Sequence, residues 1–508
     1  MKPWFRSNVR RLALQLGPLA LCSLLVCFAF PLRASAQDSP SGTSGSADKT
    51  VQTDKTQSQD TPNPPPSSDE PTPGDPVTLF PHSESSRYWI SGQANIVFQW
   101  HPTFPARYSG PNSLSAQAQS ATTHILTLYT GYELTPTTEV FLDIEDATGG
   151  GIGNALGLAG YTDLDSVRTA NGVVLSKAPY LARLMLRQII PLGSQRVEAE
   201  RDPLHLATSV PARRIEIRFG KFDLVDFFDV NTWGSDSHLQ FLNWTADNLG
   251  AYDYAANTRG YTDGALLEYD DHWFTARFAE SLMPKVANGI NLDADIARAR
   301  EEALEFEFRQ HLIAKQRGVV RFLSYLNHAN MGSYEEAIRN FEKGKAGLAP
   351  PIPVPNIVST RVQGRHKYGF GLNLEEEITP RFGVFSRLGW SDGRNESFAY
   401  TECDRTLDLG AFAAGENWHR RNDRAGVAFI ANGIVKAHQQ YLALGGVGFL
   451  LGDGNLTYGP EKIFEAFYTL HVWRGFFTSF DLQHINNPGY NQDRGPVTVP
   501  TLRLHVDF

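Results

Sequence analysis

The sequence has few cysteines and no long apolar stretch in its interior. It carries three cysteines in 508 residues, Cys22, Cys27 and Cys403. The first two lie in a segment that we expect to be removed, so the mature chain cannot form an internal disulfide and must be stabilised by other means. No run of about 18 apolar residues follows that segment, which excludes membrane-spanning helices. A net charge of −9 gives no reason to expect nucleic-acid binding.

The first 36 residues have the three parts of a secretory signal peptide. Four basic residues within residues 2–11 precede an apolar run over residues 12–30, and an A-x-A cleavage site ends at Ala36. Gln15, Gly17 and Pro18 interrupt the apolar run, which argues against a retained membrane anchor. We therefore expect residues 1–36 to be cleaved and the mature chain to be exported.

Residues 37–86 differ in composition from the rest of the chain. They are rich in serine, threonine and proline and contain few apolar side chains. Such a segment buries too little surface to offset its ordering entropy, so we predict a disordered periplasmic leader. The folded unit is then residues 87–508, roughly 420 residues, which is long for one soluble core but suits a single large membrane barrel.

The chain ends in a strict alternation of apolar and polar residues. One face of the terminal segment carries Pro500, Leu502, Leu504, Val506 and Phe508, and the other carries Thr501, Arg503, His505 and Asp507. This pattern is typical of the closing strand of an outer-membrane barrel, because one face meets lipid and the other a polar lumen. On these residues alone, an edge strand of a soluble sandwich remains the alternative.

Charged residues in the alternating segments favour the barrel. Residues 139–145 place an apolar face of Val140, Leu142 and Ile144 against an acidic face of Glu139, Asp143 and Glu145, and residues 304–309 repeat the pattern. Charges on the inner face of a soluble sandwich would be costly, whereas a wet lumen solvates them. We predict an all-β fold, a transmembrane antiparallel β-barrel of about 16 strands, with 18 as the alternative.

The spacing of turn residues predicts short periplasmic turns and long extracellular loops. Short turns are expected at residues 135–137, 315–318, 379–381 and 473–475. The longest irregular stretches are residues 101–121, 146–178, 284–302, 329–364 and 391–404. Within them, residues 293–302 and 333–343 have locally helical patterns.

No motif for enzymatic chemistry is present. The sequence lacks G-x-S-x-G, H-E-x-x-H and a P-loop lysine, and its histidines have no metal-ligand spacing. We therefore expect no catalytic residues, no cofactor and no metal. The glycine-rich residues 149–157 miss the dinucleotide-binding spacing by one position and are interpreted as a bent loop.

Residues 219–261 combine carboxylates, amides and an arginine with aromatic side chains. This mixture suits sugars, because aromatic faces cover pyranose C–H groups while the polar groups match hydroxyls as donors and acceptors. On chemistry alone, a loop packed by its own aromatics with solvated charges is an equally good reading.

Several linked motifs in this segment resemble the carbohydrate-selective porins (the OprB type) of Gram-negative outer membranes. They are G-K-F followed by D-x-F-D-x-N at residues 220–231, Q-F-x-N-W at residues 240–244, and A-Y-D-Y with T-R-G-Y at residues 251–261. Further similarity at residues 93–114, 178–183 and 479–488 extends the resemblance over about residues 87–508.

The resemblance implies a barrel of about 16 strands in which inward-folded loops and basic strand residues form a narrow sugar-selective channel. It places six residues near the constriction: Asp226, Asp229, Asn231, Asn243, Trp244 and Arg259. Strand parity makes Arg183, Arg187 and Arg218 candidate basic residues of the lumen wall.

The leading functional hypothesis is substrate-selective passive diffusion of mono- or oligosaccharides across the outer membrane. The alternatives are a barrel channel for small organic anions, a barrel-borne hydrolase and a secreted sugar-binding protein. Expected partners are the carbohydrate, outer-membrane lipid and the barrel-assembly machinery, which reads the final aromatic residue. The chain is expected to be a monomer or a homotrimer.

Overall fold

A computed structural model describes residues 77–83, 85–169, 175–310 and 316–508. The predicted signal peptide and most of the predicted leader lie outside the described residues, so their boundaries remain predictions. Among the described residues, no helix has both the length and the apolar character needed to cross a bilayer.

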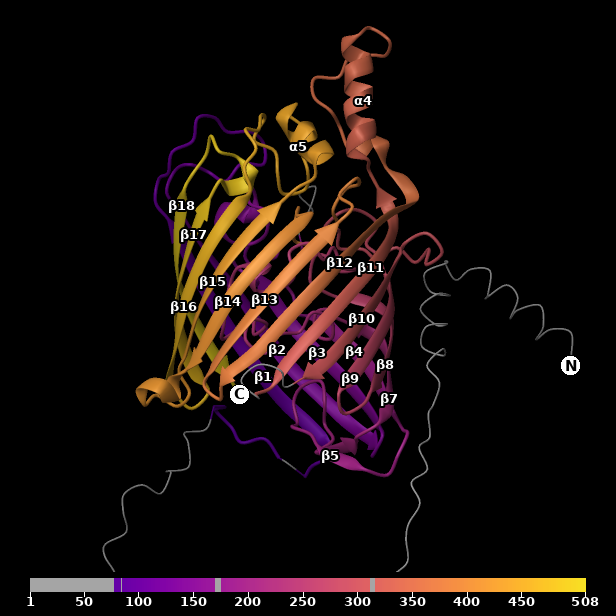
Figure 1. Cartoon of the computed structure of the whole chain (residues 1–508), viewed down its shortest axis with the longest axis vertical. Coiled ribbons are helices and arrows are strands. Elements are labelled where there is room, and N and C mark those ends of the chain that lie inside the picture. Colours follow the sequence, from indigo (N-terminus) through magenta and orange to yellow (C-terminus); the bar gives the residue numbers. More distant parts are fainter. Residues whose placement is uncertain (1–76, 84, 170–174, 311–315) are drawn as a thin grey trace, which may run out of the picture. The chain divides into compact units, whose positions relative to one another are not determined.

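Sixteen of the described strands close into one antiparallel barrel (Figure 1), as predicted. The barrel strands are β1 (Tyr88–His101), β2 (Gln119–Thr135), β3 (Thr138–Thr148), β4 (Tyr180–Pro191), β7 (Arg214–Phe222), β8 (Thr262–Asp270), β9 (Phe274–Leu282), β10 (Arg300–Gln310), β11 (Gly318–Met331), β12 (Val362–Thr379), β13 (Phe382–Ser391), β14 (Arg405–Ala414), β15 (Arg424–Gly433), β16 (Glu461–Trp473), β17 (Phe476–Asn486) and β18 (Val497–Asp507). Pairing of β1 with β18 closes the barrel. Two short strands between β4 and β7, β5 (Arg196–Glu198) and β6 (Ser209–Pro211), form a separate sheet.

Most turns at one end of the barrel are short, and the long loops lie at the other end (Figure 1). The exception is the long connection between β4 and β7, residues 192–213, which carries β5 and β6 at the end with the short turns. The predicted turns at residues 135–137, 379–381 and 473–475 are confirmed, because strand pairing resumes directly after each of them. The predicted turn at residues 315–318 lies partly outside the described residues, and β11 begins at Gly318.

The long loops carry the helices. They include α3 (Trp244–Asp247), α4 (Tyr334–Lys345) and α5 (Lys436–Ala443), with short 3-10 turns η1 (Ile152–Ala155), η3 (Val358–Thr360) and η5 (Pro488–Tyr490); η4 (Gly415–Trp418) lies in a turn at the opposite end. The helix predicted at residues 333–343 is confirmed as α4, which Ser333 caps by accepting the Glu336 N–H.

The helix predicted at residues 293–302 is wrong. Asp295 accepts the backbone N–H groups of Arg298 and Ala299, which makes only one turn. From Arg300 onward the backbone pairs with β9 and β11 on both sides. The neighbouring strands therefore override the local helical pattern.

The predicted facing of the strands is confirmed at both ends of the chain. On β1, Ile96, Phe98 and Trp100 are exposed on the outer surface, while Asn95 and Gln99 are buried inside. On β18 the odd and even residues separate in the same way: Leu502 and Leu504 face outward, and Arg503 and His505 face inward. The outer face of the barrel is thus apolar and the inner face polar, as a lipid-embedded barrel requires.

The inward charges are mostly paired and buried rather than solvated. On the inner wall of β3 to β12, Arg187 lies between Glu139 and Glu216, and Arg277 contacts Glu268 and Glu305. The expectation of a wet lumen around these groups is therefore corrected. Loops fold into the barrel and exclude water, so each charge needs an opposite partner.

Candidate functional site: a cavity inside the barrel

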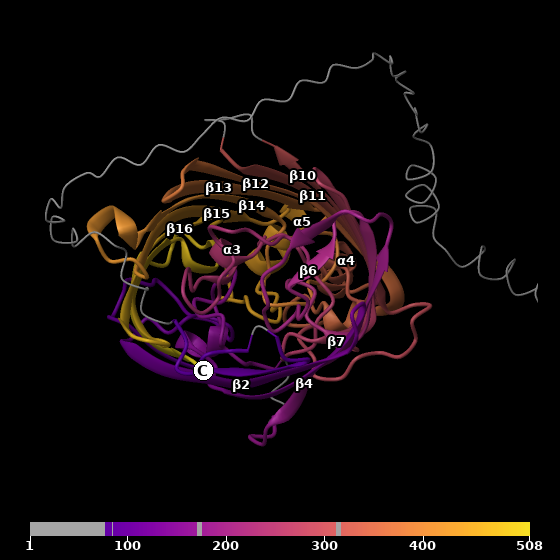
Figure 2. The same ribbon diagram turned by 90° about the horizontal axis from the view of Figure 1, so that it is seen from below.

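The loop between β7 and β8, residues 223–261, folds into the barrel. We call it the inner loop. Figure 2, a view along the barrel from the end with short turns, shows α3 within the outline of the strands. Asn243 caps α3 by accepting the Thr245 N–H at 3.0 Å. All six residues that the resemblance placed near a constriction belong to this loop.

Three of those six residues attach the inner loop to the wall formed by β10 to β18. Asp229 pairs with Arg387 of β13 at 3.0 Å. The Asn231 side chain donates to Asn373 of β12 at 2.7 Å, and the Asn243 side chain donates to Gln483 of β17 at 3.0 Å.

These three anchoring residues do not line the cavity described below. Their side chains face the wall and not the open space of the cavity. Their amide and carboxylate groups are buried and satisfied by wall residues, which positions the loop.

Further contacts from the wall reach the backbone of the inner loop. Glu465 of β16 accepts the Leu242 N–H at 2.6 Å, and Arg503 of β18 donates to the Gln240 carbonyl at 2.7 Å. Charged wall residues therefore satisfy backbone groups of a loop that has no secondary structure over most of its length.

A cavity of about 340 Å³ lies on the other side of the inner loop, against β1 to β4. We call it the lumen cavity. Its volume is within the range of small-molecule sites. Its lining combines aromatic rings with carboxyl, amide, hydroxyl and guanidinium groups: Gln93, Tyr129, Glu145, Asp165, Tyr180, Arg183, Asp223, Asp226, Ser235, Ser237, His238, Trp244, Asp247, Asn248, Thr258, Arg259, Tyr261 and Tyr400.

Of the predicted constriction residues, Asp226, Trp244 and Arg259 line this cavity. Trp244 stacks on Tyr400 with ring centroids 4.3 Å apart, and Tyr161 meets its edge at 6.2 Å. Only 8% of Trp244 remains exposed. Tyr254 also lies nearly parallel to the indole, with ring centroids 6.3 Å apart. The indole is therefore largely covered by protein rings, so any sugar contact is limited to the remaining exposed part.

Arg259 is held by aromatic stacking. Its guanidinium lies 3.5 Å from the centroid of the Tyr180 ring, and it donates to the Ser176 carbonyl at 3.0 Å. The Tyr180 hydroxyl in turn donates to Glu145, which also accepts from the Tyr261 hydroxyl at 3.0 Å. The wall and the inner loop thus meet through a chain of tyrosines and a single carboxylate.

Among the candidate basic wall residues, only Arg183 lines the lumen cavity. It contacts Asp143 of β3 and Asp226 of the inner loop, the latter at 2.5 Å. Its charge is therefore shared with two carboxylates and does not make the cavity strongly positive.

Arg187 and Arg218 are on the inner wall as predicted but not on the cavity. Arg187 is 1% exposed between Glu139 and Glu216, at 2.8 and 2.7 Å. Arg218 pairs with Glu216 at 2.6 Å and lies 4.8 Å from the centroid of the Phe227 ring. Arg187 therefore joins β3 to β4 and β7, while Arg218 also contacts the inner loop.

Asp247 is a third carboxyl group of the inner loop at the cavity, after Asp223 and Asp226. Burial raises the pKa of Asp247 to about 8. One of its oxygens accepts from Ser237 and Asn248, and the other has no hydrogen-bond partner among the described residues. When protonated, this group donates as well as accepts, which matches a sugar hydroxyl.

A second loop, between β3 and β4, forms part of the cavity lining. Asp165 of this loop accepts from Asn95 of β1 at 2.5 Å, and the Tyr161 carbonyl accepts the Trp244 N–H at 2.8 Å. Sequence reasoning missed Asp165, and it missed Tyr400 from the loop between β13 and β14. No local pattern singles out either residue, because long-range folding alone brings them to the cavity.

In the part of the chain that the structure describes, no group of three or more His, Cys, Asp and Glu side chains is arranged to hold a metal.

A family model and one solved structure agree with this architecture. The family model described as "Carbohydrate-selective porin, OprB family" matches residues 112–508. Pseudomonas putida OprB, in its high-pH structure, superposes with a TM-score of 0.60 at 13% identity, covering 83% of this chain and 94% of that one. The Acinetobacter baumannii channel DcaP gives a TM-score of 0.43 at 8% identity, covering 83% and 97%. A search of curated proteins finds no match.

Proposed function

This chain belongs to the OprB family of carbohydrate-selective porins of the Gram-negative outer membrane, and we propose that the lumen cavity is where it selects sugars. Family and fold indicate a channel rather than an enzyme. In outer-membrane barrels the end with short turns faces the periplasm and the end with long loops faces the outside of the cell, and we orient this barrel in the same way.

One observation carries the proposal: a single cavity combines stacking surfaces with donors and acceptors that are held in place. Trp244 and Tyr400 supply aromatic surface, and Arg259 and Asp226 supply a donor fork and an acceptor. Weak contacts of these kinds favour entry of a pyranose without trapping it, which passive diffusion requires.

The charges at the cavity favour neutral sugars over organic anions. Carboxyl groups outnumber guanidinium groups along the lining, and Arg183 is neutralised by Asp143 and Asp226. An anion channel would need an excess of positive charge at this point. The organic-anion alternative therefore has little support from the lining.

We also propose two partners, outer-membrane lipid and the barrel-assembly machinery, from the outer surface of the barrel. The exposed apolar outer face fits outer-membrane lipid, and the terminal strand fits recognition by the barrel-assembly machinery. A single chain encloses the whole cavity, so a monomer suffices for transport, and a homotrimer would repeat the same path.

Planar-bilayer conductance measured with added sugars tests whether sugars pass through the lumen cavity. Trp244→Ala should weaken sugar block roughly two- to tenfold, since an aromatic contact contributes about 0.5–1.5 kcal/mol. Trp244→Phe keeps an aromatic ring and should restore most of the block. Arg259→Gln should weaken sugar block and reduce the passage of anions together, because it removes a donor fork and one charge.

A matched control is Arg298→Gln, which changes an exposed arginine of the loop between β9 and β10. It should leave block and conductance unchanged. If Trp244→Ala and Arg259→Gln fold into heat-modifiable barrels and bind sugar like the parent, the lumen cavity is not the selecting site.

A further inference from the structure

The outer surface of β13 to β17 is hollowed by a groove of about 450 Å³. Strand register accounts for it. In the row nearest the periplasmic turns, Ala413 lies opposite Ala425, and in the next row Ala411 lies opposite Val427. Ala466 continues that second row on β16. Four alanines in two adjacent rows therefore form a depression in the outer surface. Most other outward positions of the barrel carry larger apolar side chains.

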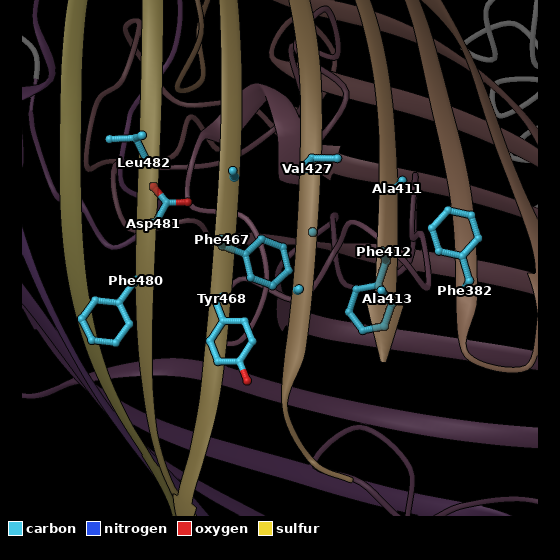
Figure 3. Close-up of a pocket in the computed structure, with 13 residues that line it drawn as sticks. Phe382, Ala411, Phe412, Ala413, Val427, Phe467, Tyr468, Phe480, Asp481 and Leu482 are labelled. Carbon is cyan, nitrogen blue, oxygen red and sulfur yellow. The ribbon is translucent and has the colours of Figure 1, made fainter. Parts of the chain in front are cut away.

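Larger side chains surround these alanines. Figure 3 shows Phe382 and Tyr468 on either side of the strands that carry Ala411, Ala413 and Val427. Toward the outside of the cell, the next row holds Leu409 opposite Phe429, both exposed. The groove is therefore closed on that side and leads toward the periplasmic turn between β14 and β15.

That turn and its neighbour carry exposed arginines at the end of the groove. Arg381 and Arg421 are exposed, and no hydrogen bond or ion pair of their side chains occurs within the described residues. Arg420 differs, because it pairs with Asp423 at 2.8 Å. Glu416 lies in the same turn. The chain as a whole has a net charge of −9. Unpaired arginines beside an apolar groove therefore differ in charge from the chain as a whole.

An aromatic pair fixes the turn against the groove. The Trp418 indole N–H donates to the Tyr468 hydroxyl at 3.1 Å, with ring centroids 6.0 Å apart. Tyr468 is itself part of the groove wall. Tryptophan and tyrosine are typical of the membrane–water boundary, which places the basic residues at headgroup depth.

We propose that this groove binds an anionic phospholipid of the periplasmic leaflet. One acyl chain lies over the four alanines, and the phosphate lies between Arg381 and Arg421. Guanidinium groups match phosphate oxygens in a forked geometry, and arginines at a membrane surface attract anionic lipid. A zwitterionic lipid carries a cation next to its phosphate, so it attracts these arginines less strongly than a lipid with a net negative charge.

Native mass spectrometry of the detergent-solubilised full chain tests this with two added lipids, phosphatidylglycerol and phosphatidylcholine. The parent should retain phosphatidylglycerol in preference. The double variant Arg381→Gln/Arg421→Gln should retain it roughly thirtyfold less, at about 1 kcal/mol per arginine. Ala413→Phe, which fills the groove, should abolish retention of both lipids at this site.

Two controls match these changes. Arg339→Gln/Lys343→Gln removes two exposed charges from α4 at the other end of the barrel, and Ala265→Phe enlarges an exposed outward residue of β8. Both should bind phosphatidylglycerol like the parent. Heat-modifiability confirms that every variant folds.

Equal retention of the two lipids by the parent would overturn the proposal, as would undiminished phosphatidylglycerol binding in both groove variants. Cross-linked oligomers that disappear in Ala413→Phe, with no lipid retained by the parent, would instead make the groove a contact between copies and would also overturn it.

Discussion

Asp229 and Arg387 form a buried ion pair that joins the inner loop to the barrel wall. The Asp229 carboxylate lies 3.0 Å from the Arg387 guanidinium, and the two side chains are 3% and 0% exposed. Arg387 also donates to the Ala246 carbonyl at 2.7 Å, and Asp229 accepts the Leu249 N–H at 2.8 Å. The pair thus holds both the start of the loop and the segment that carries α3.

Breaking this pair should release the inner loop without unfolding the barrel. Asp229→Ala leaves a buried arginine with only Asp408 as an ionic partner, and loss of one member of a buried pair costs about 3–5 kcal/mol. The barrel strands keep their own pairing, so we expect heat-modifiable protein with higher and noisier single-channel conductance.

The double variant Asp229→Ala/Arg387→Met tests whether the effect belongs to the pair. It should lie closer to the parent than the sum of the two single variants, because neither Asp229 nor Arg387 is left buried without the other. Asp295→Ala, which breaks an exposed pair with Arg298, is the control and should not change conductance. A parental conductance in Asp229→Ala would show that the pair does not hold the loop.

The terminal residue depends on a glycine of β1. Phe508 exchanges two backbone hydrogen bonds with Gly92, at 2.6 and 2.9 Å, and its ring lies 2.6 Å from where a Gly92 Cβ would stand. Gly92→Ala should therefore displace the ring and lower the yield of assembled barrel, as should deletion of Phe508. Gly193→Ala meets no atom within 4 Å and serves as the control.

Val506→Asp tests the outward face of the same strand. A charge on the lipid face costs about 2–4 kcal/mol at mid-membrane depth and less near the interface, where Val506 is expected to lie. Assembly measured by heat-modifiability should fall, while the channels that do form should conduct normally. A normal yield of barrel would contradict the assigned orientation.

Two deletions separate the predicted leader from the folded unit. Removing residues 38–73 should leave folding and conductance unchanged, because so polar a segment contributes no core. Removing residues 38–86 should destabilise the closing strand. Leu79 donates to the Asp507 carbonyl at 2.9 Å, and Arg201 binds the Ser83 and Ser86 carbonyls at 2.5 and 2.9 Å. Loss of barrel from the shorter deletion would show that the leader is needed for folding.

Cys403 provides a reporter of folding. It is 2% exposed in the loop between β13 and β14, and burial raises the pKa of its thiol to about 11. At pH 8 the folded thiol is therefore protonated and inaccessible, so a maleimide should label the protein only after heat unfolding. One label per mature chain is expected if the signal peptide is cleaved, and three labels would show that it is retained.

The strands and turns were predictable because their signals are local. A strand alternates its side chains with a period of two, so the facing of Ile96, Asn95 and Leu502 follows from neighbouring residues alone. The failed helix at residues 293–302 marks the limit of such reasoning. There the pairing of β10 with β9 and β11 determined the structure, and those partners are distant in sequence.

The candidate site was only partly predictable. Composition and motifs directed attention to the inner loop, but they could not separate Asp226, which lines the cavity, from Asp229, which faces the wall. The two residues belong to one motif and have similar side chains. Their roles differ because the loop backbone turns between them, with Asp229 in the left-handed region at a φ of 59°.

By itself, the sequence determined the barrel, its polar interior and its apolar outer face, because alternation and turn residues act over a few positions. The tertiary structure decided that residues 223–261 form the loop that enters the barrel. Only the tertiary structure decided which wall holds the inner loop and which residues border the remaining cavity. Asn231 meets Asn373 across 142 positions, and Tyr400 reaches Trp244 from another loop. Contacts of this range depend on the closure of the whole barrel, and no local pattern specifies which polar groups become partners.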